Sequence, residues 1–192
     1  MEAPEHLACA KCGSEENLAR CQDCFWAPVW CKKCCVEVHF HLPFHRIEVW
    51  TGKHFRSSSL TEIGYVLYLG HSGKPCPSYS LPYQSSAFPT PSSIVVVDSN
   101  GIFTLKVYWC LCEGDTAHHI QLLRSYLYPG STINPSTAST FDVMDHFYMD
   151  ALECKTSAMS FYSKLRRFTN NTFPNRVPVR TSQKLRYLYL LF

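Results

Sequence analysis

The feature that most constrains this chain is a dense run of cysteines near its start. Residues 21–35, CQDCFWAPVWCKKCC, place five cysteines in fifteen positions. Three pairs have the spacing Cys-x2-Cys and three histidines follow them: Cys9/Cys12, Cys21/Cys24 and Cys31/Cys34, then His39, His41 and His45. A Cys-x2-Cys pair on a tight turn brings two thiolates to one metal ion, and two pairs complete a tetrahedron. The loops between the pairs are too short to form a hydrophobic core, so we expect metal to replace it.

The expected compartment favours metal over disulfides. The chain has eleven cysteines, an odd number. Residues 1–20 lack the apolar core of an export signal, and no run approaches the roughly 18 apolar residues of a membrane span. We therefore expect an intracellular protein with no membrane partner, where closely spaced cysteines hold metal more often than they form disulfides. Disulfides or redox chemistry are the alternative, but a thioredoxin-like site needs one Cys-x2-Cys at the start of a helix.

Interleaved pairing, as in B-box and RING-like modules, assigns these residues to two zinc ions. The first set is Cys9, Cys12, Cys31 and Cys34. The second set is Cys21, Cys24 and two histidines. His45 is favoured because an apolar stretch that can pack over the site follows it, and its partner is His39 or His41, since the spacing allows either. Cys35 and Cys154 are expected to be core thiols.

After Trp50 the cysteines thin out and alternating apolar residues appear. We expect a strand that starts near residue 64 and ends at Gly70, a Pro/Ser-rich loop over 77–93, and a hairpin over 94–112 that turns at Ser99-Asn100-Gly101. Helices are expected over 118–128, 139–152 and 156–168. The predicted class is α+β. A zinc-stapled, B-box/RING-like unit occupies residues 1–50, a mostly antiparallel β region with C-terminal helices occupies 51–171, and 172–192 form an irregular basic and apolar tail.

A third metal site is predicted where the strand before Gly70 meets the hairpin. His71, Cys76, Cys110 and Cys112 converge if these strands are neighbours, which gives three thiolates and one imidazole. The alternative is a set of buried, inert cysteines, which are among the most often buried residues. Two zinc ions are therefore expected, with a third left open.

Net charge does not decide whether the chain binds nucleic acid. The formal charge is +3. A zinc ion held by four thiolates has a net charge of about −2 together with its ligands, and one held by three thiolates and one imidazole has about −1. A zinc ion held by two thiolates and two imidazoles is about neutral, so the chain with all three ions bound would be near neutral. The distribution of charge along the chain is more informative. Residues 151–192 contain 8 Lys and Arg against 1 Asp or Glu, whereas residues 1–150 contain 10 Lys and Arg against 14 Asp and Glu.

The basic C-terminal segment predicts salt-sensitive phosphate contacts. We assign these contacts first to Lys164, Arg166 and Arg167, with Arg176, Arg180, Lys184 and Arg186 in the same segment. A solvated helix face followed by an unfolded tail is the alternative.

The order of several separate motifs resembles a known family. These motifs are CQDCFWAPVWCKKCCVEVHFHLPFHRIEVWTGKHF, SLTEIGYVLYLGHSGKPCP, VVVDSNGIFTLKVYWCLC, QLLRSYLYPGSTINPSTASTFDVMDHF and KTSAMSFYSKLRRFTNN. From about Cys9 to Asn171 the chain resembles the cysteine-cluster domain that precedes the catalytic region in KDZ (Kyakuja-Dileera-Zisupton) transposases of fungi. In that family pattern the histidines match His39 and His45, which moves the choice of ligand from His41 to His39. The residues around the third site belong to the pattern too.

The resemblance implies a zinc-binding accessory domain of a transposable element, acting in the nucleus on DNA or in assembly with a transposase. We expect a fragment that is not an enzyme, because a complete transposase would continue past Asn171 into its nuclease. Catalysis would need gathered carboxylates, for which Asp98, Asp142, Asp145 and Asp150 are candidates in a ribonuclease-H-like reading. Turn and helix-cap roles are the alternative for these four.

The third functional class is a protein-interaction module of the B-box type. It would use aromatic side chains of the N-terminal unit: Phe25, Trp26, Trp30, Phe40, Phe44 and Trp50. Most of these are expected to cover the metal ions instead. No small-molecule substrate is evident.

Overall fold

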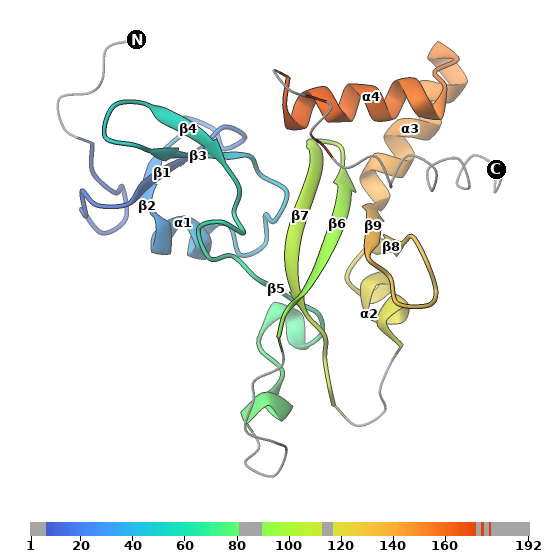
Figure 1. Cartoon of the computed structure of the whole chain (residues 1–192), viewed down its shortest axis with the longest axis horizontal. Helices are drawn as coiled ribbons and strands as arrows, with labels where there is room; N and C mark the ends of the chain where they lie inside the picture. The colour runs from blue at the N-terminus through green and yellow to red at the C-terminus, as the bar shows by residue number, and fades with distance from the viewer. Residues whose placement is uncertain (1–6, 81–89, 113–116, 172–173, 175–176, 178–192) are drawn as a thin grey trace. The chain divides into compact units, whose positions relative to one another are not determined.

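The chain divides into two compact units between Tyr65 and Val66 in a computed structural model (Figure 1). The structure describes residues 7–80, 90–112, 117–171, 174 and 177. The predicted basic residues Arg176, Arg180, Lys184 and Arg186 lie outside these residues. No helix in the described ranges is long and apolar enough to cross a membrane.

The first unit contains a four-stranded antiparallel sheet in the order β2-β1-β3-β4. Its elements are β1 (Leu18–Cys21), β2 (Val29–Cys31), α1 (Lys32–Val38), β3 (Ile47–Trp50) and β4 (Phe55–Ser58). Ile47 and Val49 alternate with the half-buried Glu48 and Trp50, which is the period expected of a strand with one face covered. The buried cluster around Leu18 includes Cys9 and Cys34, so cysteines make up part of this small core.

The second unit is built on a five-stranded mixed sheet in the order β5-β7-β6-β9-β8. Its strands are β5 (Leu67–Tyr68), β6 (Ser92–Asp98), β7 (Gly101–Tyr108), β8 (Leu127–Pro129) and β9 (Thr137–Thr140). The predicted hairpin is confirmed as β6 and β7, which pair antiparallel around Ser99 and Asn100. β5 pairs with β7, the neighbour that the predicted third site required. The parallel direction of this pair and the parallel pairing of β9 with β6 were not predicted. The α+β class is confirmed.

The segment after the hairpin differs from its prediction. The predicted helix over 118–128 ends early, as α2 (His118–Arg124), because Tyr126 takes a left-handed φ of 57° and Leu127 begins β8. Strand β9 was not predicted, since its sequence, Thr-Ala-Ser-Thr, has no alternation of apolar residues. It is nevertheless buried between β6 and β8, where pairing on both sides outweighs local preference.

Two capped helices cover one end of the second sheet. They are α3 (Phe141–Cys154) and α4 (Ala158–Thr169). The hydroxyls of Thr140 and Ser157 accept hydrogen bonds from main-chain N–H groups in the first turn of each helix, which is the usual role of Ser and Thr at an N-cap. α4 lies across the turn end of the hairpin (Figure 1), where the N–H of Ile102 donates to the hydroxyl of Thr169 (2.7 Å).

The core of the second unit lies between these helices and the hairpin. One buried cluster there comprises Val97, Ile102, Val143, Phe147, Phe161, Tyr162, Leu165 and Val177. Cys154 is exposed at the end of α3, so the prediction that it is a core thiol was wrong. Cys35 is fully buried, as predicted.

Candidate metal centres

Three groups of four Cys and His side chains each bring their ligand atoms within 4.8 Å of one another. The first centre is Cys9, Cys12, Cys31 and Cys34. The second centre is Cys21, Cys24, His39 and His45, and the third centre is His71, Cys76, Cys110 and Cys112. All eleven cysteines are free. The structure therefore gathers every residue that the sequence assigned to a metal, in the predicted sets, and their role as zinc ligands stays a prediction.

The spacing of the ligand atoms fits a tetrahedral zinc ion. Two thiolates at about 2.3 Å from one ion are about 3.8 Å apart, and a thiolate and an imidazole nitrogen are about 3.6 Å apart. The Sγ atoms of Cys12 and Cys31 are 3.7 Å apart, and those of Cys76 and Cys110 are 3.8 Å apart. The Sγ of Cys24 is 3.5 Å from His39 Nε2. Disulfide sulfurs would be about 2.0 Å apart, so these contacts are not disulfide bonds, and their lengths are those expected of metal ligands.

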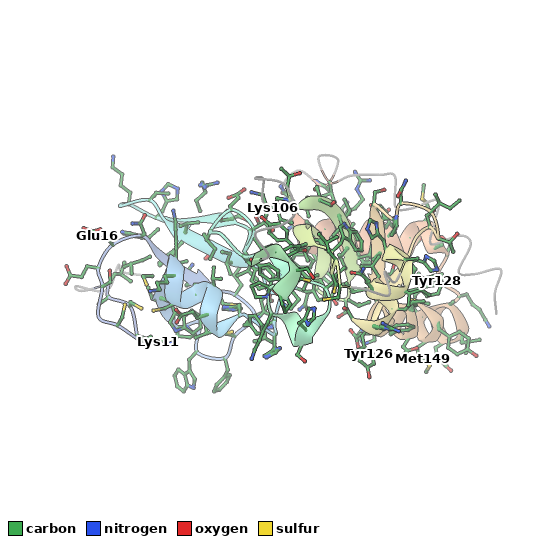
Figure 2. All side chains as sticks on the ribbon, turned by 90° about the horizontal axis from the view of Figure 1, so that it is seen from below. Lys11, Glu16, Lys106, Tyr126, Tyr128 and Met149 are labelled. Carbon is green, nitrogen blue, oxygen red and sulfur yellow. The ribbon has the colours of Figure 1, made fainter. Side chains whose placement is uncertain are left out.

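The first centre joins the segment before β1 to the start of α1. Cys31 is both the last residue of β2 and the N-cap of α1, which places Cys34 in the first turn of that helix. Burial opposes ionisation of Cys9, but backbone hydrogen bonds from Cys31, Cys12 and Lys11 outweigh it and lower its pKa to about 6. Thiolate is the form that binds metal, so the backbone prepares this ligand. Lys11, labelled in Figure 2, pairs with Glu37 of α1 (2.7 Å).

In the second centre the histidine that lies with His45 is His39 and not His41. His39 is fully buried at the end of α1, and its Nδ1 lies 2.8 Å from the carbonyl oxygen of Cys35. That contact makes Nδ1 the protonated nitrogen and leaves Nε2 free to face Cys24. Burial lowers the pKa of His39, which favours the neutral imidazole that metals bind. His41 is exposed and its ring packs on Phe40, so it lies outside the centre.

An ion pair fastens the two halves of the second centre. Asp23 lies between Cys21 and Cys24, and Arg46 directly follows His45. The Arg46 guanidinium contacts Asp23 Oδ1 (2.5 Å), and the Arg46 main-chain N–H donates to Oδ2 (2.6 Å). Burial alone would raise the pKa of Asp23, but the hydrogen bonds from Arg46 lower it below its ordinary value. The carboxylate therefore stays ionised and holds the two ligand loops together.

Cys35 lies beside the second centre without belonging to it. Burial raises the pKa of its thiol to about 12, so it stays protonated. Its Sγ is 3.7 Å from His39 Nδ1, the nitrogen that faces away from Cys24. The main-chain carbonyl of Cys35 orients the ring of His39, so Cys35 supports the second centre through its main chain and not through its thiol.

The third centre lies at the end of β7 opposite to α4. His71 begins the 3-10 helix η1 (His71–Gly73), Cys76 directly precedes η2 (Pro77–Ser80), and Cys110 and Cys112 follow β7. His71 Nε2 is 3.3 Å from the Sγ of Cys110 and 3.2 Å from that of Cys112. Burial opposes ionisation of Cys76, but backbone hydrogen bonds from Leu111 and Ser78 outweigh it and lower its pKa to about 6.

Three residues around the third centre were missed by sequence reasoning. Gly70 has a φ of 93°, and a Cβ there would lie 3.1 Å from the Cβ of Cys110. The hydroxyl of Tyr79 donates to the carbonyl of Trp109, just before the Cys110 ligand. The side chain of Gln121 bonds to the main chain of Cys110. The glycine directly before His71 is the only sequence signal that pointed to any of them.

The predicted phosphate-binding residues lie on α4. Lys164 forms an ion pair with Asp150 (2.5 Å) and lies over the ring of Phe161. Arg166 donates from Nε to the carbonyl of Pro174 (2.8 Å). Arg167 is exposed and lines a shallow groove of about 530 Å³ together with Met159, Ser160, Ser163, Lys164 and Phe168.

The four candidate carboxylates have structural contacts or face solvent. Asp98 is buried at the end of β6 and accepts a hydrogen bond from the N–H of Asn100 (3.0 Å), which is turn chemistry. Burial raises its pKa. Asp142 lies 3.8 Å from His146 one turn along α3, Asp145 is exposed on that helix, and Asp150 binds Lys164.

The aromatic side chains of the first unit fall into two groups. Trp30, Phe44 and Trp50 are half-buried, as expected of residues that cover the centres. Phe25 and Trp26, just after Cys24, are 85% and 86% exposed and pack against each other edge to face. Phe40 is 39% exposed.

Comparison with known proteins identifies one family. A family model described as "CxC2 like cysteine cluster associated with KDZ transposases" matches residues 60–173, which is more than half of the chain. The third centre lies inside the matched range, whereas the first and second centres precede it. No curated protein and no solved structure matches the chain.

Proposed function

The chain belongs to the family of CxC2-like cysteine clusters associated with KDZ transposases, and we propose that it is a non-catalytic, zinc-ordered accessory module of such a transposase. In this proposal it works in the nucleus, in DNA targeting or in assembly of the transposase. The observation that supports the metal part is the set of three groups of four Cys and His residues, each with its possible ligand atoms within 4.8 Å of one another.

Native mass spectrometry of the full chain tests the metal part. We expect three zinc ions on the reconstituted protein, and loss of all three on exhaustive chelation at low pH. A chain that takes up no zinc, and keeps its fold with all thiols free, would contradict the proposal.

The DNA-targeting role is supported by the basic face of α4. Arg167 is exposed there beside Lys164, with the hydroxyls of Ser160 and Ser163 lining the same groove. Guanidinium, ammonium and hydroxyl groups are the usual donors to phosphate oxygens, and they bind without regard to sequence. Phosphate would compete with Asp150 for Lys164, so the contribution of Arg167 is expected to be the larger.

A salt titration against duplex DNA tests this role. We expect Arg167→Glu to weaken binding and to reduce the slope of log affinity against log salt by about 1. Lys106→Glu, which makes the same charge change on an exposed residue of β7 (labelled in Figure 2), is the matched control and should have a smaller effect. No measurable DNA binding at low salt would eliminate the role.

The exposed Phe25-Trp26 pair favours assembly with another protein as a second candidate. Exposed aromatic residues on a rigid turn make effective anchors, because few rotamers are lost when they enter a pocket. With a purified KDZ-type transposase as probe, we expect Trp26→Ala to weaken binding at least tenfold with little dependence on salt. Tyr126→Ala removes an aromatic ring that is 80% exposed in the second unit (Figure 2) and serves as control. Equal binding by both variants would exclude the anchor.

A further inference from the structure

Gln121 is a buried side chain that bonds to both main-chain groups of one predicted ligand. It lies on α2 and is only 6% exposed. Its Oε1 accepts from the N–H of Cys110 (2.9 Å), and its Nε2 donates to the carbonyl of Cys110 (3.1 Å). One carboxamide therefore satisfies the donor and the acceptor of the same residue.

Cys110 lies beyond the last residue of β7 that pairs with a neighbouring strand. In the described part of the second sheet, β7 makes its last pairing with β6 at Val107 and with β5 at Tyr108. A main-chain donor and acceptor that leave a sheet must find other partners or water. The Gln121 carboxamide offers the same pair of groups as a neighbouring strand, so it extends main-chain hydrogen bonding two residues past the end of β7, to Cys110 in the third centre.

From this arrangement we propose that Gln121 is a positioning residue for the third metal centre. Fixing the main chain of Cys110 fixes the origin of its Sγ, and Cys112 follows two residues later on the same segment. The distance from zinc to each sulfur must stay close to about 2.3 Å. A segment that is already ordered loses less conformational entropy when it binds the ion, so holding this segment in place raises metal affinity. The inference rests on the proposed zinc binding at this centre.

Neighbouring contacts fix the same segment to the same helix. The ring of Trp109 stacks on His118 at the start of α2, with ring centres 4.0 Å apart. The indole N–H of Trp109 donates to the hydroxyl of Ser92 (3.0 Å). These contacts hold Trp109, whereas within the described residues Gln121 is the side chain that hydrogen-bonds to the main chain of Cys110. The two contributions are therefore separable by substitution.

The test compares metal binding by the full-length chain and two variants of Gln121. Gln121→Glu keeps the length and the acceptor but sets an anionic oxygen against the carbonyl of Cys110, and Gln121→Met keeps the approximate length without either bond. We expect both to lower the affinity of the third centre about 10–100-fold, as loss of supporting hydrogen bonds around a metal does, and to leave the other two centres unchanged. Affinities are measured by competition with a chelator, using Co²⁺ as probe.

Leu122→Ala is the matched control, because Leu122 is the next residue of α2 and is fully buried. It weakens the packing of the helix but keeps the Gln121 bonds. At saturating Co²⁺ the absorption bands of the three-thiolate, one-imidazole site should change in the Gln121 variants. They should stay unchanged in Leu122→Ala, even though this substitution is expected to lower the Tm of the chain.

The outcomes separate this inference from the proposed function. Suppose that the wild-type chain binds three ions. The inference alone would then be overturned if the Gln121 variants bound all three as tightly as the wild type, or if Leu122→Ala weakened the third centre as much as they do. A wild-type chain that binds no ion at the third centre would overturn the inference together with that centre.

Discussion

Gly70 shows how a single residue can determine the shape of a metal site. Its φ of 93° lies in the left-handed region, and its missing side chain leaves room for Cys110. Any other residue would pay the cost of this backbone conformation and would also push against the ligand. The residue before His71 is therefore constrained by the site although it offers no ligand atom.

We expect Gly70→Ala to weaken metal binding at the third centre and to destabilise the second unit by at least about 1–2 kcal/mol, the cost of a left-handed L-residue. Gly64→Ala is the control, because Gly64 has a similar φ of 105° with nothing within 4 Å of its added Cβ. This variant should lose stability because of its left-handed backbone conformation, without a change in metal affinity at the third centre. Chelator competition and thermal unfolding measure both effects, and equal affinity in the two variants would show that the contact with Cys110 is unimportant.

The cysteines of the first unit differ in what their removal should cost. We expect Cys31→Ala and Cys21→Ala each to lower the Tm of this unit strongly, because each leaves a metal with three ligands. Cys35→Ala removes one buried sulfur that binds no metal, so its cost is expected to be about 1–2 kcal/mol. Thermal unfolding with zinc present measures all three, and identical Tm values would refute the ligand assignment.

At the scale of elements, the helix caps of the second unit have unequal surroundings. Thr140 is buried, caps α3 and also hydrogen-bonds to the carboxylate of Asp98. Ser157 is exposed and caps α4. The two residues make the same cap bond, so the difference between them isolates the effect of burial and of the contact with Asp98.

We expect Thr140→Ala to lower the free energy of unfolding by about 2 kcal/mol and Ser157→Ala by about 1 kcal/mol, the usual loss for an N-cap. Denaturant unfolding at pH 7 with zinc present measures both. A Ser157→Ala variant that loses more stability than Thr140→Ala would show that the bond to Asp98 contributes little.

At the scale of the whole molecule, the two units are expected to depend on metal to different degrees. The first unit has a small core that includes two predicted ligands, Cys9 and Cys34. The second unit has a separate apolar core between α3, α4 and the hairpin, far along β7 from the third centre. Metal supplies folding free energy directly where no other core is present.

Exhaustive chelation is therefore expected to unfold the first unit and to leave the hairpin and α3–α4 core of the second unit folded. Amide hydrogen exchange measures this residue by residue: protection should vanish in β1 and β3 and persist in β6, β7 and α4. Simultaneous loss of protection in both units would contradict independent cores, and retained protection in β1 would contradict the role of metal.

The order of residues predicted much of the candidate site and less of the sheet around it. Ligand spacing allowed the sets to be chosen, because two thiols separated by two residues can reach one metal ion with little strain. The choice between His39 and His41 could not be made from spacing, since it depends on which ring the end of α1 turns inward. Gln121 could not be predicted either, because its partner is eleven residues away across a change of direction.

By itself, the sequence predicted which residues are gathered as candidate metal ligands, where the hairpin turns, and where α3 and α4 begin, because these depend on residues close together in the chain. Only the tertiary structure decided that Thr137–Thr140 is a strand inside the second sheet, that α2 stops at Arg124, and that a buried carboxamide takes the place of a strand beside Cys110. Those features depend on hydrogen-bond partners supplied by distant segments, and the free energy of such pairing appears only when the segments meet.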